Sequence, residues 1–245
     1  TATIAVDALG SDNVVGVALP SKYNTEESLV DARLLAENLD IEFKVIEIEE
    51  IVNIFRNTLK ESVNDELGQT TDENIQSRVR GNILMALSNQ TGAMVVSTGN
   101  KSEMAVGYST LYGDLAGGFA LLKDLYKTEV YNLANFRNSI SSVIPQNTID
   151  KEPSAELSPN QFDKDSLPEY ELLDEILRMY IEEDSSSEKI IAAGIDENVV
   201  YDVLSKVDRN EYKRKQVAPG VKLTEKAFGK DRRMPITNTY IRERG

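Results

Sequence analysis

The 245-residue chain carries 27 Lys and Arg residues against 41 Asp and Glu residues, a formal net charge of −14 at pH 7 that argues against nucleic acid or an anionic membrane as a partner. It contains no Cys and no His, which excludes disulfide frameworks, thiolate zinc clusters, cysteine nucleophiles and imidazole bases. No apolar run approaches the roughly 20 residues that span a bilayer, so we expect a cytoplasmic protein.

The first half of the chain alternates between helical and strand patterns. The spacing of apolar residues predicts helices over about 1–9, 25–38, 49–67 and 72–90, and strands over about 14–19, 41–46 and 93–96. Thr25, followed by two glutamates, is typical of a helix start. The strand at 93–96 is continuously apolar, which is typical of a strand covered on both faces. This order predicts an α/β fold with a doubly wound parallel sheet.

The composition changes after about residue 143. Four prolines mark a loop-rich passage: Pro145, Pro153, Pro159 and Pro168. Helices are predicted beyond it over about 168–182, 188–193 and 197–206. We expect residues 144–245 to form a loop-rich, helical C-terminal part of one domain that covers residues 1–245.

The segment from Ser97 to Glu103 follows the strand expected at 93–96, at the end where parallel sheets bind ligands. Thr98 and the glycine after it can approach a phosphate closely, Lys101 offers positive charge, and Glu103 can bind Mg²⁺ through hard oxygen atoms. This composition predicts a nucleotide or phosphate site. An ordinary turn between a strand and a helix has a similar composition, so that alternative stays open.

An ordered series of motifs extends from this segment through nearly the whole chain. The motifs are Leu19-Pro20-Ser21, Asp72–Arg80, Ser97–Glu103, Tyr112-Gly113-Asp114, Lys123–Thr128, Lys151–Leu157, Asp163–Pro168, Asn210–Arg214 and Arg232–Ile236. In this order they resemble the synthetase domain of NAD⁺ synthetases of the glutamine-dependent type. The resemblance implies a Rossmann-like, adenine nucleotide alpha hydrolase-like fold of the ATP pyrophosphatase superfamily.

The resemblance also implies a reaction. The nicotinate carboxylate of deamido-NAD⁺ would attack the α-phosphate of ATP, and ammonia would then displace AMP from the adenylate, with Mg²⁺ as the cofactor. Neither step needs His or Cys, because positioning and charge neutralisation catalyse phosphoryl transfer. A chain without Cys would receive ammonia from a separate glutaminase domain or subunit, although free ammonium stays open as the source. We also expect a homodimer or a larger homo-oligomer.

The family's functional positions transfer to eight residues of this sequence. The resemblance places ATP at Thr98, Lys101 and Lys127, and the metal at Glu103, with Glu103 and Lys127 as the catalytic pair. It places deamido-NAD⁺ at Asn74, Arg78, Glu103, Asp114 and Lys213. Without the resemblance, Asn74 and Arg78 would be interpreted as a helix-surface pair one turn apart, and Asp114 as a turn residue.

One departure from the family stands out, because no Ser-Gly-Gly-x-Asp-Ser loop for the ATP pyrophosphate occurs in the sequence. We interpret residues 1–9 as the rest of the helix that should follow that loop, and expect the domain to be N-terminally incomplete and barely active alone. Two other hypotheses remain. The chain is another adenylating amidotransferase, similar to GMP synthetase, or a non-catalytic binding remnant.

Overall fold

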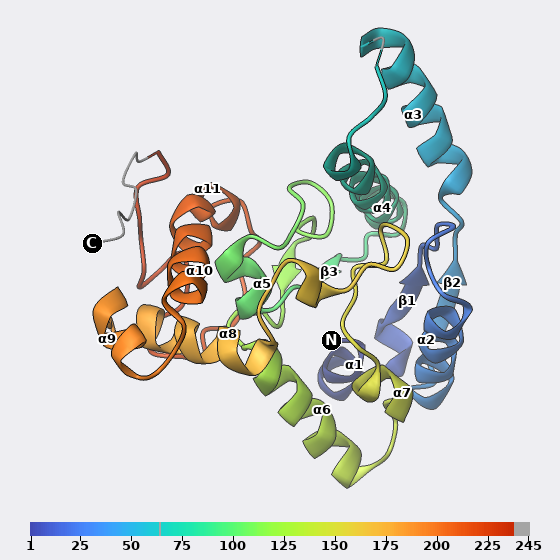
Figure 1. Cartoon of the computed structure of the whole chain (residues 1–245). Coiled ribbons are helices and arrows are strands. Elements are labelled where there is room, and N and C mark those ends of the chain that lie inside the picture. The colour runs from blue at the N-terminus through green and yellow to red at the C-terminus, as the bar shows by residue number, and fades with distance from the viewer. Residues whose placement is uncertain (64, 238–245) are drawn as a thin grey trace. The chain divides into compact units, whose positions relative to one another are not determined.

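The computed structural model describes residues 1–63 and 65–237, and the chain divides into two compact units (Figure 1). The first unit consists of residues 1–86 and 131–166. The second consists of residues 87–130 and the residues from 167 onward. Each unit is therefore assembled from two separate stretches of the chain.

The first unit has a small parallel sheet with helices before, between and after its strands. Its elements in chain order are α1 (Ala2–Leu9), η1 (Ser11–Asn13), β1 (Val15–Ala18), α2 (Glu26–Asn38), β2 (Glu42–Val45), α3 (Glu49–Val63), most of α4 (Gln69–Thr91), most of α6 (Lys127–Ile140), α7 (Gln146–Asp150) and η2 (Asp163–Asp165). Val15 pairs with Glu42 and Ala18 with Val45. The side chain of Thr25 accepts a hydrogen bond from the Ser28 N–H, which confirms the helix start predicted there.

The second unit is mostly helical around a shorter parallel pair. Its elements are β3 (Val96–Ser97), α5 (Lys101–Val106), β4 (Phe119–Ala120), the start of α6 (Lys127–Ile140), α8 (Tyr170–Leu177), the π-helical turn η3 (Arg178–Glu182), α9 (Ser187–Ala192), α10 (Glu197–Arg209) and α11 (Glu211–Arg214). Val96 pairs with Phe119 and Ser97 with Ala120.

The expected α/β class with parallel strands is confirmed, but two details of the sheet differ from the prediction. The described residues form two separate two-stranded sheets in place of one continuous sheet. The strand expected at 93–96 begins only at Val96 and pairs with β4 through two residues. Ala93 and Met94 are exposed, Met94 by 64%, so the expectation of a strand covered on both faces is wrong for them.

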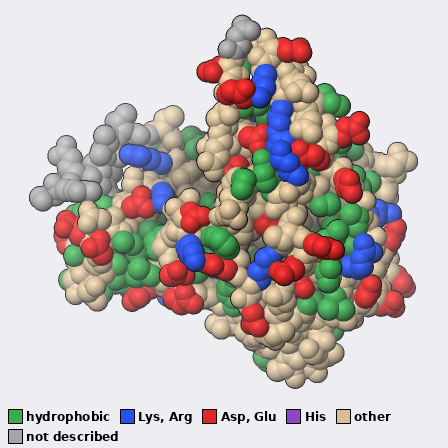
Figure 2. Space-filling view, turned by 45° about the vertical axis from the view of Figure 1, so that its right-hand side comes forward, with side chains coloured by type: hydrophobic (Ala, Val, Ile, Leu, Met, Phe, Trp, Pro, Cys, Tyr) green, Lys and Arg blue, Asp and Glu red, His purple; other side chains and the backbone are tan. Residues whose placement is uncertain are grey.

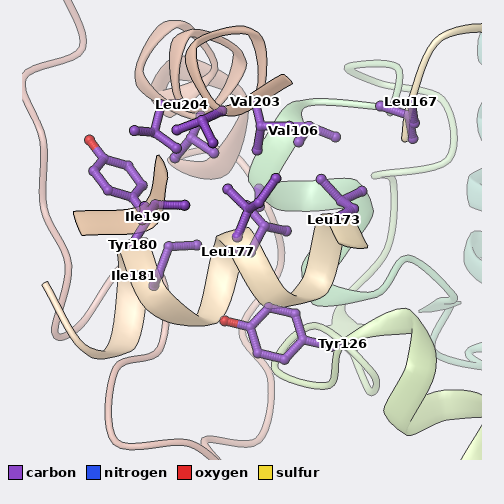
Figure 3. Packing of buried hydrophobic residues seen from close by; sticks show 14 of the residues in the cluster. Val106, Tyr126, Leu167, Leu173, Leu177, Tyr180, Ile181, Ile190, Val203 and Leu204 are labelled. Atoms are coloured by element: carbon purple, nitrogen blue, oxygen red, sulfur yellow. The ribbon is translucent and has the colours of Figure 1, made fainter. Parts of the chain in front are cut away.

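The larger of two apolar clusters in the described part of the second unit lies around α8 and α10. Apolar residues recur on α8 at three- and four-residue spacing, and Leu173 and Leu177 point toward Val106 and Val203 (Figure 3). Tyr126 lies on the other side of α8 (Figure 3). Val106 is the last residue of α5, and its packing in this core holds α5 in place.

Charges of both signs are dispersed over one face of the protein. Figure 2 shows carboxylates interspersed with lysines and arginines over the face that it draws. The described part of the chain offers no helix of the length and apolar character that crossing a membrane requires. Local groupings of charge, therefore, decide where an anionic ligand can bind.

Candidate functional site

The segment after β3 turns directly into α5 through a reciprocal cap. The Asn100 side chain accepts a hydrogen bond from the Glu103 N–H at 3.0 Å, and Glu103 Oε2 accepts one from the Asn100 N–H at 3.2 Å. This capping box fixes the Glu103 side chain on the first turn of the helix. Thr98, just before it, is exposed.

The second oxygen of Glu103 faces a lysine from another helix. Lys127 begins α6, and its Nζ lies 3.2 Å from Glu103 Oε1. Both side chains are 20% exposed, so the ion pair is held by the protein and still reaches solvent. The ring of Tyr170 lies 5.1 Å from the same Nζ. The structure thus brings together the two residues expected to be catalytic.

Lys101 occupies a different environment from the one expected, because its side chain is fully buried. Its Nζ lies 3.0 Å from both Asp124 Oδ1 and Glu182 Oε1, and donates to Thr224 Oγ1 at 2.6 Å. An ammonium group held in this way does not reach a phosphate in solvent. The expected ATP contact of Lys101 therefore stays a prediction that this buried, ion-paired geometry does not support.

Aromatic and backbone contacts complete the environment of Lys101. Its Nζ lies 4.8 Å from the ring centroid of Tyr126, with Arg178 5.1 Å from the same centroid. Burial raises the pKa of Asp124, but the Thr224 and Leu223 N–H groups and Lys101 outweigh it, so this pKa lies below its ordinary value. The Asp124 carboxylate is therefore stabilised in its charged form by these neighbours.

Asp114 and Lys213 are anchored to one turn of the second unit, which follows α5. Asp114 Oδ1 accepts a hydrogen bond from the Thr110 N–H at 2.6 Å. Lys213, on α11, donates from Nζ to the carbonyl oxygens of Gly107 and Ser109 at 2.6 and 2.7 Å. Burial lowers the pKa of Lys213, while the charge of Asp114 opposes that shift. These two expected positions are brought close to each other.

Asn74 and Arg78 lie on α4 in the first unit. Ile75 and Val79 of the same helix pack against Ile48 and Val52, which leaves Asn74 half-buried and Arg78 exposed. A cavity of about 350 Å³ lies beside the first turns of α4. Its lining consists of Tyr23, Gln69, Asp72, Glu73, Ser158 and Pro159.

The donor set fits Mg²⁺ only together with a phosphate ligand. In residues 1–63 and 65–237 no group of three or more carboxylates converges on a point where a metal ion could bind. Mg²⁺ commonly binds one or two carboxylates and completes its octahedron with water and substrate phosphates. Glu103 would be one such protein ligand, with a phosphate supplying the others.

The sequence interpretation missed Asp174, which is buried at 1% exposure behind the Glu103–Lys127 pair. It accepts hydrogen bonds from the Ser102 hydroxyl and from the Thr128 N–H. The available signal was an acidic residue within the apolar face of a helix, between Leu173 and Ile176. The pattern of this stretch predicts a helix and does not show which residues the carboxylate contacts.

Comparison with known proteins identifies the family. Residues 1–217 match the family model described as NAD synthase. The chain belongs to this family. It is 53% identical over 241 residues to the glutamine-dependent NAD(+) synthetase of Aquifex aeolicus, and 51% identical over 242 residues to that of Acinetobacter baylyi. Both alignments cover 98% of this chain but 42% and 45% of those proteins, so the chain spans less than half of their length.

Solved structures agree with the family assignment and with the fold. The glutamine-dependent NAD+ synthetase from Acinetobacter baumannii in complex with ADP is 47% identical, with a TM-score of 0.61, over 96% of this chain and 42% of that one. The NMN synthetase from Francisella tularensis is 26% identical, with a TM-score of 0.73, over 91% of this chain and 82% of that one. Members of the NAD synthase family therefore share this α/β fold.

Proposed function

We propose that this chain carries out the ATP-dependent amidation of deamido-NAD⁺ to NAD⁺. Membership of the NAD synthase family supports the reaction class. The observation that carries the proposal is the Glu103–Lys127 ion pair, which lies 3.2 Å apart and partly exposed beside the segment that follows β3. In such a pair the carboxylate can bind the metal ion of a metal-bound polyphosphate, and the ammonium group can bind its phosphate oxygens.

In the first step, the nicotinate carboxylate forms a bond to the α-phosphorus of ATP, and the bond to the bridging oxygen of the β-phosphate breaks, which releases pyrophosphate. Lys127 would stabilise the negative charge that develops on the departing pyrophosphate. The hydroxyl of Thr98 would orient a phosphate oxygen of ATP. Mg²⁺, held by Glu103, would supply further charge neutralisation.

In the second step, ammonia attacks the carbonyl carbon of the adenylate, loses a proton and displaces AMP. Contacts to deamido-NAD⁺ are assigned to Asn74, Arg78, Asp114 and Lys213. The relatives named glutamine-dependent support glutamine as the source of ammonia, through a glutaminase domain or subunit. We further propose that the protein is cytoplasmic and forms a homodimer or a larger homo-oligomer.

A second candidate keeps the chemistry and changes the substrate. The similarity to an NMN synthetase over 82% of that chain favours nicotinate mononucleotide as an alternative acceptor. The two substrates differ by the adenylate half of the dinucleotide. Measuring turnover of the complete protein with each, at equal ATP, Mg²⁺ and ammonium, distinguishes them, and we expect the larger kcat/KM with deamido-NAD⁺.

The decisive variant is Glu103→Gln, which keeps the shape of the side chain and removes its charge. We expect kcat for NAD⁺ formation to fall on the order of 10²–10³-fold, as when one preorganised charge-stabilising group is lost. Glu175→Gln is the matched control, because Glu175 is an exposed residue of α8. Equal turnover of the Glu103 and Glu175 variants across a Mg²⁺ titration would remove Glu103 from the site.

A further inference from the structure

The N-termini of α5 and α6 are joined by a buried set of hydrogen bonds that the proposed reaction does not use directly. The Ser102 hydroxyl donates to Asp174 Oδ1 and accepts from the Lys127 N–H at 2.9 Å. Asp174 Oδ2 accepts from the Thr128 N–H at 2.9 Å. We call these four groups the Ser102–Asp174 clasp.

The clasp is isolated from water and fixed on the core. Ser102 is fully buried and Asp174 is 1% exposed. Leu173 and Leu177, on either side of Asp174 along α8, belong to the apolar cluster of the second unit. Both carboxylate oxygens of Asp174 therefore have defined donors, and the helix that carries them is held by packing.

The hydrogen bonds of the clasp involve backbone or side-chain groups next to each of the two proposed active side chains. Ser102 precedes Glu103, and the Lys127 N–H belongs to the residue whose Nζ meets Glu103. We propose that Asp174 and Ser102 are positioning residues, which set the spacing of Glu103 and Lys127 for a phosphate ligand. This inference rests on the proposed function, because it assigns to the clasp the geometry of that site.

A positioning role and a merely structural role of Asp174 predict different effects of its substitution on the free energy of unfolding. Burial raises the pKa of Asp174 above its ordinary value, with Ser102 and Thr128 opposing the shift. The folded protein thus disfavours the charge, and its electrostatic cost is present once pH rises through the pKa of Asp174. Asp174→Asn removes that cost along with one acceptor, so loss of stability need not accompany loss of activity.

The test uses Ser102→Ala, Asp174→Asn and the double variant in the complete protein. The control is Asp208→Asn, because Asp208 is also a buried acid of the second unit that accepts a hydroxyl hydrogen bond, from Tyr180 at 2.7 Å. We expect kcat to fall about 10–100-fold in both clasp variants, with a smaller change in the KM for ATP. The double variant should lose no more kcat than the less active of the two single variants, because the two groups act as one unit. Asp208→Asn should stay within about twofold of wild type.

A kcat within about twofold of wild type in both single variants would overturn the inference, as would strictly additive losses in the double variant. If Asp174→Asn does not fold, Ser102→Ala decides alone, since it removes both bonds of the hydroxyl. Glu103→Gln is measured in parallel. An unchanged rate in that variant would refute the proposed site, whereas a low rate there with active clasp variants would refute the clasp alone.

Discussion

Lys101 and Glu103 lie two positions apart on the first turn of α5, yet their charges enter opposite environments. Two residues advance an α-helix by about 200°, so side chains at this spacing leave on nearly opposite sides. Lys101 points into the interior, toward Asp124 and Glu182, whereas Glu103 meets Lys127 at the surface. One short helix thus contributes a buried ammonium group and a partly exposed carboxylate.

This separation predicts the effect of Lys101→Met on stability. Removing the ammonium leaves the Asp124 carboxylate, which is 2% exposed, without its cation, and breaking a buried pair in this way typically costs about 3–5 kcal/mol. Lys206→Met is the control, since it breaks a partly exposed pair with Asp202 that is worth less than about 1 kcal/mol. Urea unfolding followed by circular dichroism gives both values. A loss below about 1 kcal/mol for Lys101→Met would contradict the anchoring role.

At the scale of elements, periodicity located most helices, because an apolar face alone identifies them. The helix predicted over 197–206 is α10, whose buried residues Val200, Val203, Leu204 and Val207 follow helical spacing. Helix α6 was not predicted, and it has no fully buried residue of its own. The loop after β3 was located from composition, but the direction of each side chain depends on helix phase and on distant partners such as Asp174. The local pattern marks such a partner at most as a polar residue within an apolar face, and it does not show which distant segment the residue contacts.

The passage after Pro145 shows the same limit. Glu156 adopts φ +49° and accepts hydrogen bonds from Ser28 Oγ and Lys151 Nζ, each at 2.7 Å, and from Asn24 Nδ2 at 2.9 Å. The carboxylate fastens this loop to the first turn of α2. Sequence composition predicted a loop here, but not a contact across more than 120 positions.

The Glu156 contacts predict a pH-dependent contribution to stability. Burial raises the pKa of Glu156, but Lys151, Ser28 and Asn24 outweigh it, so the pKa is lowered overall. A lowered carboxyl pKa contributes stability above the unfolded value of about 4.3 and loses it as pH falls through the folded value. Glu156→Gln should therefore be less stable than wild type at pH 7, on the order of 1.5 kcal/mol, with the difference shrinking below about pH 4.3.

Thermal unfolding between pH 3 and 7 measures this difference. Glu152→Gln serves as the control, because Glu152 is 43% exposed and pairs only with the exposed Lys164 among the ion pairs of the described chain. That control should stay within about 0.5 kcal/mol of wild type throughout. A stability gap for Glu156→Gln that is constant across the pH range would refute the assignment.

At the scale of the whole molecule, exposed apolar side chains support self-association. Ile51 lies one helical turn before Ile54 and Phe55 on α3, and the three side chains are 38%, 60% and 47% exposed. Large exposed apolar residues at helical spacing form a contiguous patch, and such patches commonly mark interfaces. The predicted homodimer would bury area of this kind.

We therefore expect sedimentation equilibrium at micromolar concentration to give twice the mass of one polypeptide. Ile54→Lys places a charge in the patch and should weaken the association at least tenfold, about 1.4 kcal/mol. Glu61→Lys, which changes an exposed residue of the same helix, is the control. A single-polypeptide mass for the wild type with substrates present would contradict the dimer.

The interleaving of the two units has a consequence during translation. The ribosome delivers Ala105 and Val106 of α5 about a hundred residues before Val203 and Leu204 of α10, against which they belong in one apolar cluster. At 5–20 residues per second this delay lasts roughly 5–20 s. Throughout that interval α5 lacks its α10 partners, so the apolar residues of this segment are covered only in part until the second half of the unit is complete.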